Sequence, residues 1–159
     1  MIEIKLTKGK VALIDNEDFD LISQHKWHSG VGGKYATTMR SGTRKDRGVI
    51  LMHRLIMGLT NEILEVDHID GDKFNNQKSN LRITTRSQNQ MNTGMYRSNT
   101  SGYKGVTYDK ANKKYIAQIV LNYKNIKLGR FKSLNDAVEA RSKAEATYHG
   151  DYARKRDTA

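Results

Sequence analysis

Residues 66–92 read VDHIDGDKFNNQKSNLRITTRSQNQMN, and this stretch predicts the order of the elements around it. The short run Leu64–Val66 leads, strand-like, into an Asp-His pair. The Asp-Gly-Asp and Asn-Asn steps that follow favour an irregular loop, because Asp and Asn side chains bond their own backbone and Gly tolerates a positive φ. Leu81–Thr84 then alternates apolar and polar side chains, which predicts a half-buried strand.

A helix is expected to follow the second strand. Thr85 and Gln88 form the T-x-x-Q pattern of a capping box, which marks a helix start. Asn89 then lies about one turn inside that helix. The predicted order is therefore strand, loop, strand, helix, with Asp67 and His68 at the front and Asn89 at the back.

These residue types together suit phosphate chemistry at a metal ion. Asp67 and Asn89 offer oxygens, the hard ligands that suit magnesium, which keeps several waters and takes the rest of its shell from substrate phosphate. Such a metal polarises a phosphoryl oxygen and stabilises the leaving alkoxide. His68, with an ordinary pKa of about 6.5, is neutral often enough at physiological pH to take a proton from water. Asn80 is expected to hold either the loop or the imidazole by hydrogen bonds.

Other interpretations of these residues exist. An Asp-Gly-Asp loop is often a surface turn, and a single histidine is more often structural than catalytic. A calcium-binding loop is a poor match, because Gly and a closing Glu are missing at the required positions. The four positions taken together favour an active site. His53, within VILMHRLIMGL (49–59), is either a second polar group near the scissile phosphate or a core histidine, and the core role is slightly favoured.

The same stretch resembles the His-Asn-His (HNH) nuclease motif, in the homing-endonuclease subgroup that has Asn in the last position. The matching pattern is D-H-I-D-G-D…N-N…N-L-R-x-T…Q-N, and MHRLIM precedes it as in similar nucleases. The resemblance implies a ββα-metal fold in which His68 is the general base and Asn80 the structure-holding member of the catalytic set. It also implies a divalent metal, magnesium or alternatively manganese, on Asp67 and Asn89.

Composition limits the classes of protein that the chain can be. The formal net charge of +11, from 28 Lys and Arg against 17 Asp and Glu, indicates a polyanion as partner. The charge could instead serve solubility or attract the protein to an anionic membrane. Membrane binding is the weaker alternative, because no Lys-rich amphipathic helix is present in the sequence. Cys is absent, which excludes disulfides and thiolate zinc sites and fits a reducing compartment. No apolar run is long enough for a membrane span or a signal peptide, so we expect a soluble, intracellular protein. The resemblance to homing endonucleases further implies a phage or mobile element as its source and the bacterial cytoplasm as its location.

Two modules are expected in these 159 residues. Residues 1–92 form the nuclease domain, in which a β-rich scaffold precedes the motif. Residues 93–102 are polar and small, which is typical of a linker. Residues 103–152 form a second module, which a resemblance described below identifies as a DNA-binding domain, and 153–159 form a basic tail.

The second module is predicted to hold a small three-stranded antiparallel sheet and one helix, so the fold class of the chain is α+β. Residues 115–121 and 126–131 are expected strands, and Ser133 is expected to cap the helix. Strand alternation leaves open which sheet face is free of the helix. That face carries either Tyr115 with its alternating neighbours or Lys127 with Gly129.

This module resembles the ethylene-response-factor type of DNA-binding domain, through S-G-Y-K-G-V, Y-I-A-Q-I, K-L-G-R-F and S-L-N-D-A. The resemblance implies a sheet that lies in the major groove of double-stranded DNA. Thr107 and Val120 replace arginines that contact DNA in that family, so its sequence preference does not transfer. The residues that the resemblance assigns are Lys104, Tyr115 and Lys127 toward DNA, with Lys113, Lys114 and Arg130 on phosphates.

The sequence thus predicts a metal-dependent DNA endonuclease of the homing or mobile-element type. One chain carries one active site, so a monomer nicks one strand and a homodimer can cut both. Two alternatives stay open: a DNA-binding transcriptional regulator with an inactive HNH scaffold, and a structural RNA-binding protein. Binding without cleavage distinguishes the regulator, and a preference for RNA distinguishes the last.

Overall fold

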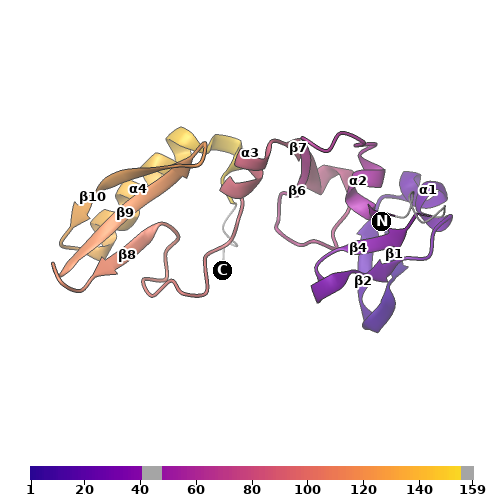
Figure 1. The fold of residues 1–159 in the computed structure, drawn as a ribbon, viewed down its shortest axis with the longest axis horizontal. Helices are drawn as coiled ribbons and strands as arrows, with labels where there is room; N and C mark the ends of the chain where they lie inside the picture. Colours follow the sequence, from indigo (N-terminus) through magenta and orange to yellow (C-terminus); the bar gives the residue numbers. More distant parts are fainter. Residues whose placement is uncertain (41–47, 155–159) are drawn as a thin grey trace. The chain divides into compact units, whose positions relative to one another are not determined.

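The computed structural model describes residues 1–40 and 48–154 of the chain (Figure 1). They form two compact units, Met1–Thr85 and Arg86–Ala159, which are described separately below. Helices are mixed with small antiparallel sheets, so the predicted α+β class is confirmed. Most of the predicted basic tail, 155–159, lies outside the described residues. No helix in the described ranges is long and apolar enough to cross a membrane.

The first unit is built on short strands around one apolar core. Its first hairpin pairs β1 with β2, and a second sheet has the order β3-β4-β5. Trp27 anchors the core and donates its Nε1–H to the carbonyl of Ile22 at 2.8 Å. The elements are β1 (Ile2–Lys5), β2 (Val11–Ile14), α1 (Phe19–Ser23), β3 (His28–Ser29), β4 (Ala36–Met39), β5 (Val49–Leu51) and α2 (Met52–Ile56).

A last hairpin completes this unit and confirms the predicted strand, loop and strand. It pairs β6 (Glu65–His68) with β7 (Leu81–Thr84) in antiparallel register. Val66 and Leu81 anchor the hairpin in the core that also holds Ile14. The predicted helix follows as α3 (Arg86–Met91), which belongs to the second unit.

The second unit holds the predicted three-stranded sheet and its helix α4, with α3 at the start of the unit. The sheet has the antiparallel order β10-β9-β8, and α4 lies across one face of it (Figure 1). Ser133 caps α4, because its Oγ accepts the N–H of Asn135 at 3.1 Å. The elements are β8 (Val106–Asp109), β9 (Lys114–Leu121), β10 (Lys124–Phe131) and α4 (Leu134–Tyr148).

The predicted linker is folded onto the start of this sheet. Asn99 Nδ2 donates to the carbonyl of Tyr103 at 2.8 Å, and Ser101 Oγ donates to that of Val106 at 2.7 Å. The division between the compact units falls between Thr85 and Arg86, ahead of the boundary expected at residue 92. Short polar residues therefore serve here as turn and cap formers, a role that composition does not distinguish from a linker.

The turn between β9 and β10 gives a first prediction. Leu121 pairs with Lys124, so the turn holds only Asn122 and Tyr123, with φ of 47° and 63°. Two positive φ angles define a type I′ turn, whose second position favours Gly. Tyr123 is 61% exposed and loses little packing when it is removed. We expect Tyr123→Gly to raise the free energy of unfolding by about 1 kcal/mol.

Urea denaturation of the full chain measures this gain. Tyr123→Ala is the matched control, because it removes the ring and keeps the left-handed backbone on a residue with a Cβ. A Tyr123→Gly protein no more stable than Tyr123→Ala would show that the turn stores no strain.

Candidate active site

The end of β6 carries two buried polar side chains side by side in sequence. Asp67 is 1% exposed and His68 is inaccessible. Arg82, the cross-strand partner of Asp67 on β7, donates to Asp67 Oδ2 from Nη2 at 2.7 Å and from Nε at 3.0 Å. A buried carboxylate needs such a partner, since an uncompensated charge is costly away from water. The hairpin therefore pairs the buried Asp67 carboxyl group with the Arg82 guanidinium.

The imidazole of His68 lies among other rings and one amide. Its Nε2 is 3.2 Å from Asn76 Oδ1 in the loop between β6 and β7. The ring of His53, from α2, packs edge-on against it with 4.9 Å between centroids. The Tyr35 ring is 6.2 Å from it. Long-range packing thus brings together a histidine pair that lies fifteen residues apart in the sequence.

Asn80 forms hydrogen bonds within the loop between β6 and β7, which is one of the two roles expected for it. Its Nδ2 donates to Asp70 Oδ1 at 2.9 Å and to the carbonyl of Asn75 at 2.8 Å, and its Oδ1 accepts the Asp70 N–H at 3.0 Å. The imidazole is held by Asn76 instead. Sequence reasoning missed Asn76, although the Asn-Asn step within the loop was the signal that contained it.

The N-terminal hairpin supports the same loop. Leu13 on β2 donates its N–H to the carbonyl of Phe74 and accepts the N–H of Asn76, both at 2.8 Å. Asp15 accepts from the Gln77 side chain at 3.0 Å and from the Lys78 N–H at 2.8 Å. The β-rich start of the chain is therefore the support of the loop.

Electrostatics keep His68 in the form that accepts protons. Burial lowers the pKa of His68, and the positive charge of Lys73 acts in the same direction. The hydrogen bond to Asn76 and the carboxylates of Asp70 and Asp67 oppose the shift. The result is a neutral imidazole at physiological pH, which is the state required of a general base.

His53 is a packed histidine beside this base. It is 4% exposed, and among the residues that the structure describes its Nδ1 has no hydrogen-bond partner. Burial lowers the pKa of His53 to about 3, with contributions from His68, Lys73 and Arg54. These features agree with the core role that the sequence slightly favoured.

The second prediction is that His53 makes the chain sensitive to acid. Its pKa is about 3 in the folded state against about 6.5 in the unfolded chain, so below that value the unfolded state binds the proton first. The neutral His53 ring therefore contributes its full share to the free energy of unfolding above pH 6.5, and this contribution is lost as the pH falls toward 3. We expect the free energy of unfolding to fall by about 2 kcal/mol from pH 7.5 to pH 5.

Urea denaturation at the two pH values measures this loss, with His53→Gln as the control that removes the titrating ring. The variant is expected to show a smaller loss between the two pH values. An equal loss in both proteins would contradict the assignment to His53. The pKa of His68 is lowered as well, so His68 accounts for part of the loss that remains in the His53→Gln variant.

Asn89, the expected second ligand, lies on α3 in the second unit, and its assignment rests on motif spacing. Within the described residues no group of three or more His, Cys, Asp or Glu side chains can hold a metal. A buried carboxylate oxygen with few further protein donors is what magnesium accepts, because water and substrate phosphate complete its shell. Asp67 supplies carboxylate oxygens of the kind that magnesium binds, and Arg82 bonds to one of them.

The expected DNA-facing residues fall into two groups. β10 pairs Lys127 with Gln118 and Arg130 with Ile116, so Lys127 and Arg130 lie on the face away from α4. Both are exposed, and so are Lys113 and Lys114 around the turn into β9.

Two of the expected DNA-facing residues, Tyr115 and Lys104, make contacts within the second unit. Tyr115 packs against the cluster of Val106, Ala117 and Ala137 on the helix side of the sheet. Lys104 precedes β8, and its Nζ donates to the carbonyls of Met91 at 2.8 Å and Thr93 at 2.6 Å. The strand register turns the Tyr115 side chain toward the helix. The two hydrogen bonds of Lys104 hold its side chain at the end of α3.

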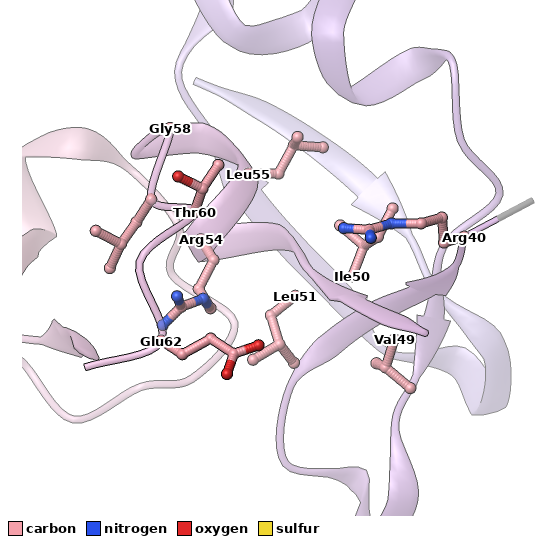
Figure 2. Close-up of a pocket in the computed structure, with 10 residues that line it drawn as sticks. Arg40, Val49, Ile50, Leu51, Arg54, Leu55, Gly58, Thr60 and Glu62 are labelled. Atoms are coloured by element: carbon pink, nitrogen blue, oxygen red, sulfur yellow. The ribbon is translucent and has the colours of Figure 1, made fainter. Parts of the chain in front are cut away.

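A surface pocket in the first unit lies apart from this chemistry. It is formed by β5, α2 and the turn after α2, as Figure 2 shows. Arg54, on its wall, donates through Nη1 to the carbonyl of Leu64 at 2.9 Å and so supports the entry to β6. The pocket contains none of the predicted site residues. Its lining residues are Arg40, Val49, Ile50, Leu51, Arg54, Leu55, Gly58, Leu59, Thr60 and Glu62.

Comparison with known proteins agrees with this geometry. A family model described as HNH endonuclease matches residues 51–91, which include α2, β6, the loop, β7 and α3. Protein 3.8 of Escherichia phage T7 is 31% identical over 89 residues, which cover 56% of this chain and 73% of that protein. The chain therefore belongs to the HNH endonuclease family.

A second relative is an uncharacterized HNH endonuclease of Acanthamoeba polyphaga mimivirus. It is 35% identical over 120 residues, or 72% of this chain. The chain spans only 58% of the length of that relative. No solved structure matches the chain.

Proposed function

We propose that the chain is a metal-dependent DNA endonuclease that hydrolyses a phosphodiester bond with His68 as its general base. The observation that carries the proposal is a buried, neutral imidazole and a buried carboxylate at consecutive positions of β6, within the segment that matches HNH endonucleases. A proton acceptor and a hard anionic ligand are the two parts that phosphodiester hydrolysis requires of a protein.

The site residues have separate roles in the proposed reaction. His68 takes a proton from the water that attacks the phosphorus, and the bond to the 3′ oxygen of the leaving strand breaks. A divalent metal on Asp67 and Asn89 would polarise the phosphate and neutralise charge on the departing oxygen. Arg82 holds the Asp67 carboxylate from β7. Asn80 keeps the loop closed around Asp70 and is a positioning residue.

The second unit is proposed to bind double-stranded DNA as an ethylene-response-factor type domain. Support comes from its three-stranded sheet with one helix, and from exposed basic side chains on and beside the open face. Lys127 and Arg130 lie on that face, with Lys113 and Lys114 at the turn into β9. These residues would position the cut by phosphate contacts, with modest base readout.

The biological setting is part of the same proposal. The relative from Escherichia phage T7 supports a homing-type or mobile-element nuclease that is encoded by a phage and acts in the bacterial cytoplasm. Magnesium is the proposed metal, with manganese as a substitute. A monomer would nick one strand, and a homodimer would cut both.

The products of the reaction test the proposal. Supercoiled plasmid treated with the protein and magnesium is expected to become an open circle whose nick DNA ligase can seal, because hydrolysis at the 3′ oxygen leaves a 3′-hydroxyl and a 5′-phosphate. A nick that ligase cannot seal would contradict this chemistry. Binding without cleavage would favour a regulator, and a preference for RNA would favour an RNA-binding protein.

The third prediction concerns the open face of the sheet. Lys127→Ala and Arg130→Ala are each expected to lower the slope of log affinity against log salt by about 0.9, because each removes one phosphate contact. Fluorescence anisotropy with a labelled duplex measures the slope. Lys143→Ala is the control of equal charge, since that exposed lysine lies on α4 and pairs with Glu139. Equal slopes in all three variants would show that the sheet face does not bind phosphate.

A further inference from the structure

The loop residue Asn76 lies against the base and is fully buried. Its Oδ1 is 3.2 Å from His68 Nε2, and its Nδ2 donates to the carbonyl of Phe74 at 3.0 Å. The amide orientation follows from this second contact, because the opposite orientation would face Oδ1 toward another acceptor. The atom that meets the imidazole is therefore an acceptor.

An acceptor at Nε2 determines where the proton of His68 lies. A neutral imidazole carries one N–H, and the nitrogen without it holds the lone pair. Because Asn76 Oδ1 can only accept, the N–H lies on Nε2 and the lone pair on Nδ1. The edge contact from His53 and the Tyr35 ring restrict the ring plane but do not select a tautomer.

The amide itself is held in place through the backbone. Asn76 donates its N–H to the carbonyl of Leu13 at 2.8 Å, and the carbonyl of Phe74 accepts the Leu13 N–H at the same distance. Asp15 holds the next two residues of the loop from the same strand end. The N-terminal hairpin therefore fixes both the position of the Asn76 backbone and the carbonyl that orients its side chain.

We propose that Asn76 is the positioning residue that sets the tautomer of His68, so that Nδ1 is the atom that takes the proton from water. Asn76 acts through the base and does not touch the reacting atoms. The functional part of this inference rests on the proposed nuclease activity, and the tautomer itself does not.

Imidazole nitrogen NMR on the full chain tests the tautomer directly, because protonated and unprotonated ring nitrogens have distinct chemical shifts. Wild type is expected to show a single tautomer with the proton on Nε2 of His68. Asn76→Leu, of similar volume and without an acceptor, is expected to show both tautomers. Asn76→Asp loses the donor to the Phe74 carbonyl but keeps an acceptor toward the ring, and is expected to keep the proton on Nε2. Asn75→Leu is the neighbouring control, since the Asn75 side chain bonds Asp70 and not the ring.

Single-turnover cleavage supplies the functional readout. Asn76→Leu is expected to cut about a hundredfold more slowly at unchanged DNA affinity, in line with other residues that orient an active group. Asn76→Asp is expected to cut at least about tenfold faster than Asn76→Leu.

A wild-type proton on Nδ1, or an Asn76→Leu protein with both the wild-type tautomer and the wild-type rate, would overturn the inference. If Asn76→Leu fails to fold, the ring-nitrogen chemical shifts of His68 in wild type and in Asn76→Asp still test the tautomer. An Nε2 proton that depends on Asn76 in a protein that cuts no DNA would leave the tautomer assignment standing and refute the nuclease.

Discussion

His68→Ala is expected to lower the single-turnover rate of DNA cleavage by about a thousandfold, within the range that positioned acid–base groups contribute. The variant removes the buried, neutral imidazole at the end of β6 and leaves Asp67 with its Arg82 partner. DNA affinity is expected to stay unchanged, because the proposed phosphate contacts lie in the other unit. Saturating enzyme separates this chemical step from binding.

The matched control is His28→Ala, which removes a histidine on β3 from the same unit. Circular dichroism and urea denaturation of both variants check that the first unit is folded. A folded His68→Ala protein that keeps more than a tenth of the wild-type rate would assign proton transfer to another group.

Asp67→Asn is expected to reduce cleavage by a similar factor, about a thousandfold, because a neutral amide is a much weaker magnesium ligand. This substitution also leaves Arg82 without its anionic partner, and a broken buried ion pair costs about 3 kcal/mol or more. Loss of activity alone would therefore not separate metal binding from stability.

A double variant separates the two effects. Asp67→Asn with Arg82→Gln replaces the ion pair by two neutral amides and is expected to regain stability without regaining cleavage. Calorimetric titration with manganese gives the metal affinity of each protein. If the double variant cut DNA and bound manganese like wild type, Asp67 would be a structural partner of Arg82 and not a ligand.

Local patterns predicted the elements well. The alternation in Leu81–Thr84 and the short run before Asp67 predicted β7 and β6, since strand pairing follows side-chain periodicity over a few residues. The helix cap at Ser133 was equally local, because a hydroxyl bonds an N–H within its own first turn. Asn80 was expected in a supporting role, and its bonds are all to the loop.

Other features depend on contacts that a local pattern does not contain. Tyr115 faces the helix because the sheet register and the packing of α4 decide which side of β9 is covered. The neighbours of His68 include Asn76 from the following loop and His53 from helix α2, which is distant in the sequence. One residue of an Asn-Asn step holds the imidazole and the other holds Asp70, and only the fold tells them apart.

The most direct measurement is the fate of supercoiled plasmid incubated with wild-type protein in magnesium, in chelator, and beside His68→Ala as the control for contaminating nuclease. The account predicts that wild type converts the plasmid to nicked or linear DNA in magnesium only, and that His68→Ala leaves it supercoiled. Wild-type protein that binds the plasmid yet leaves it intact with magnesium and with manganese would contradict the account.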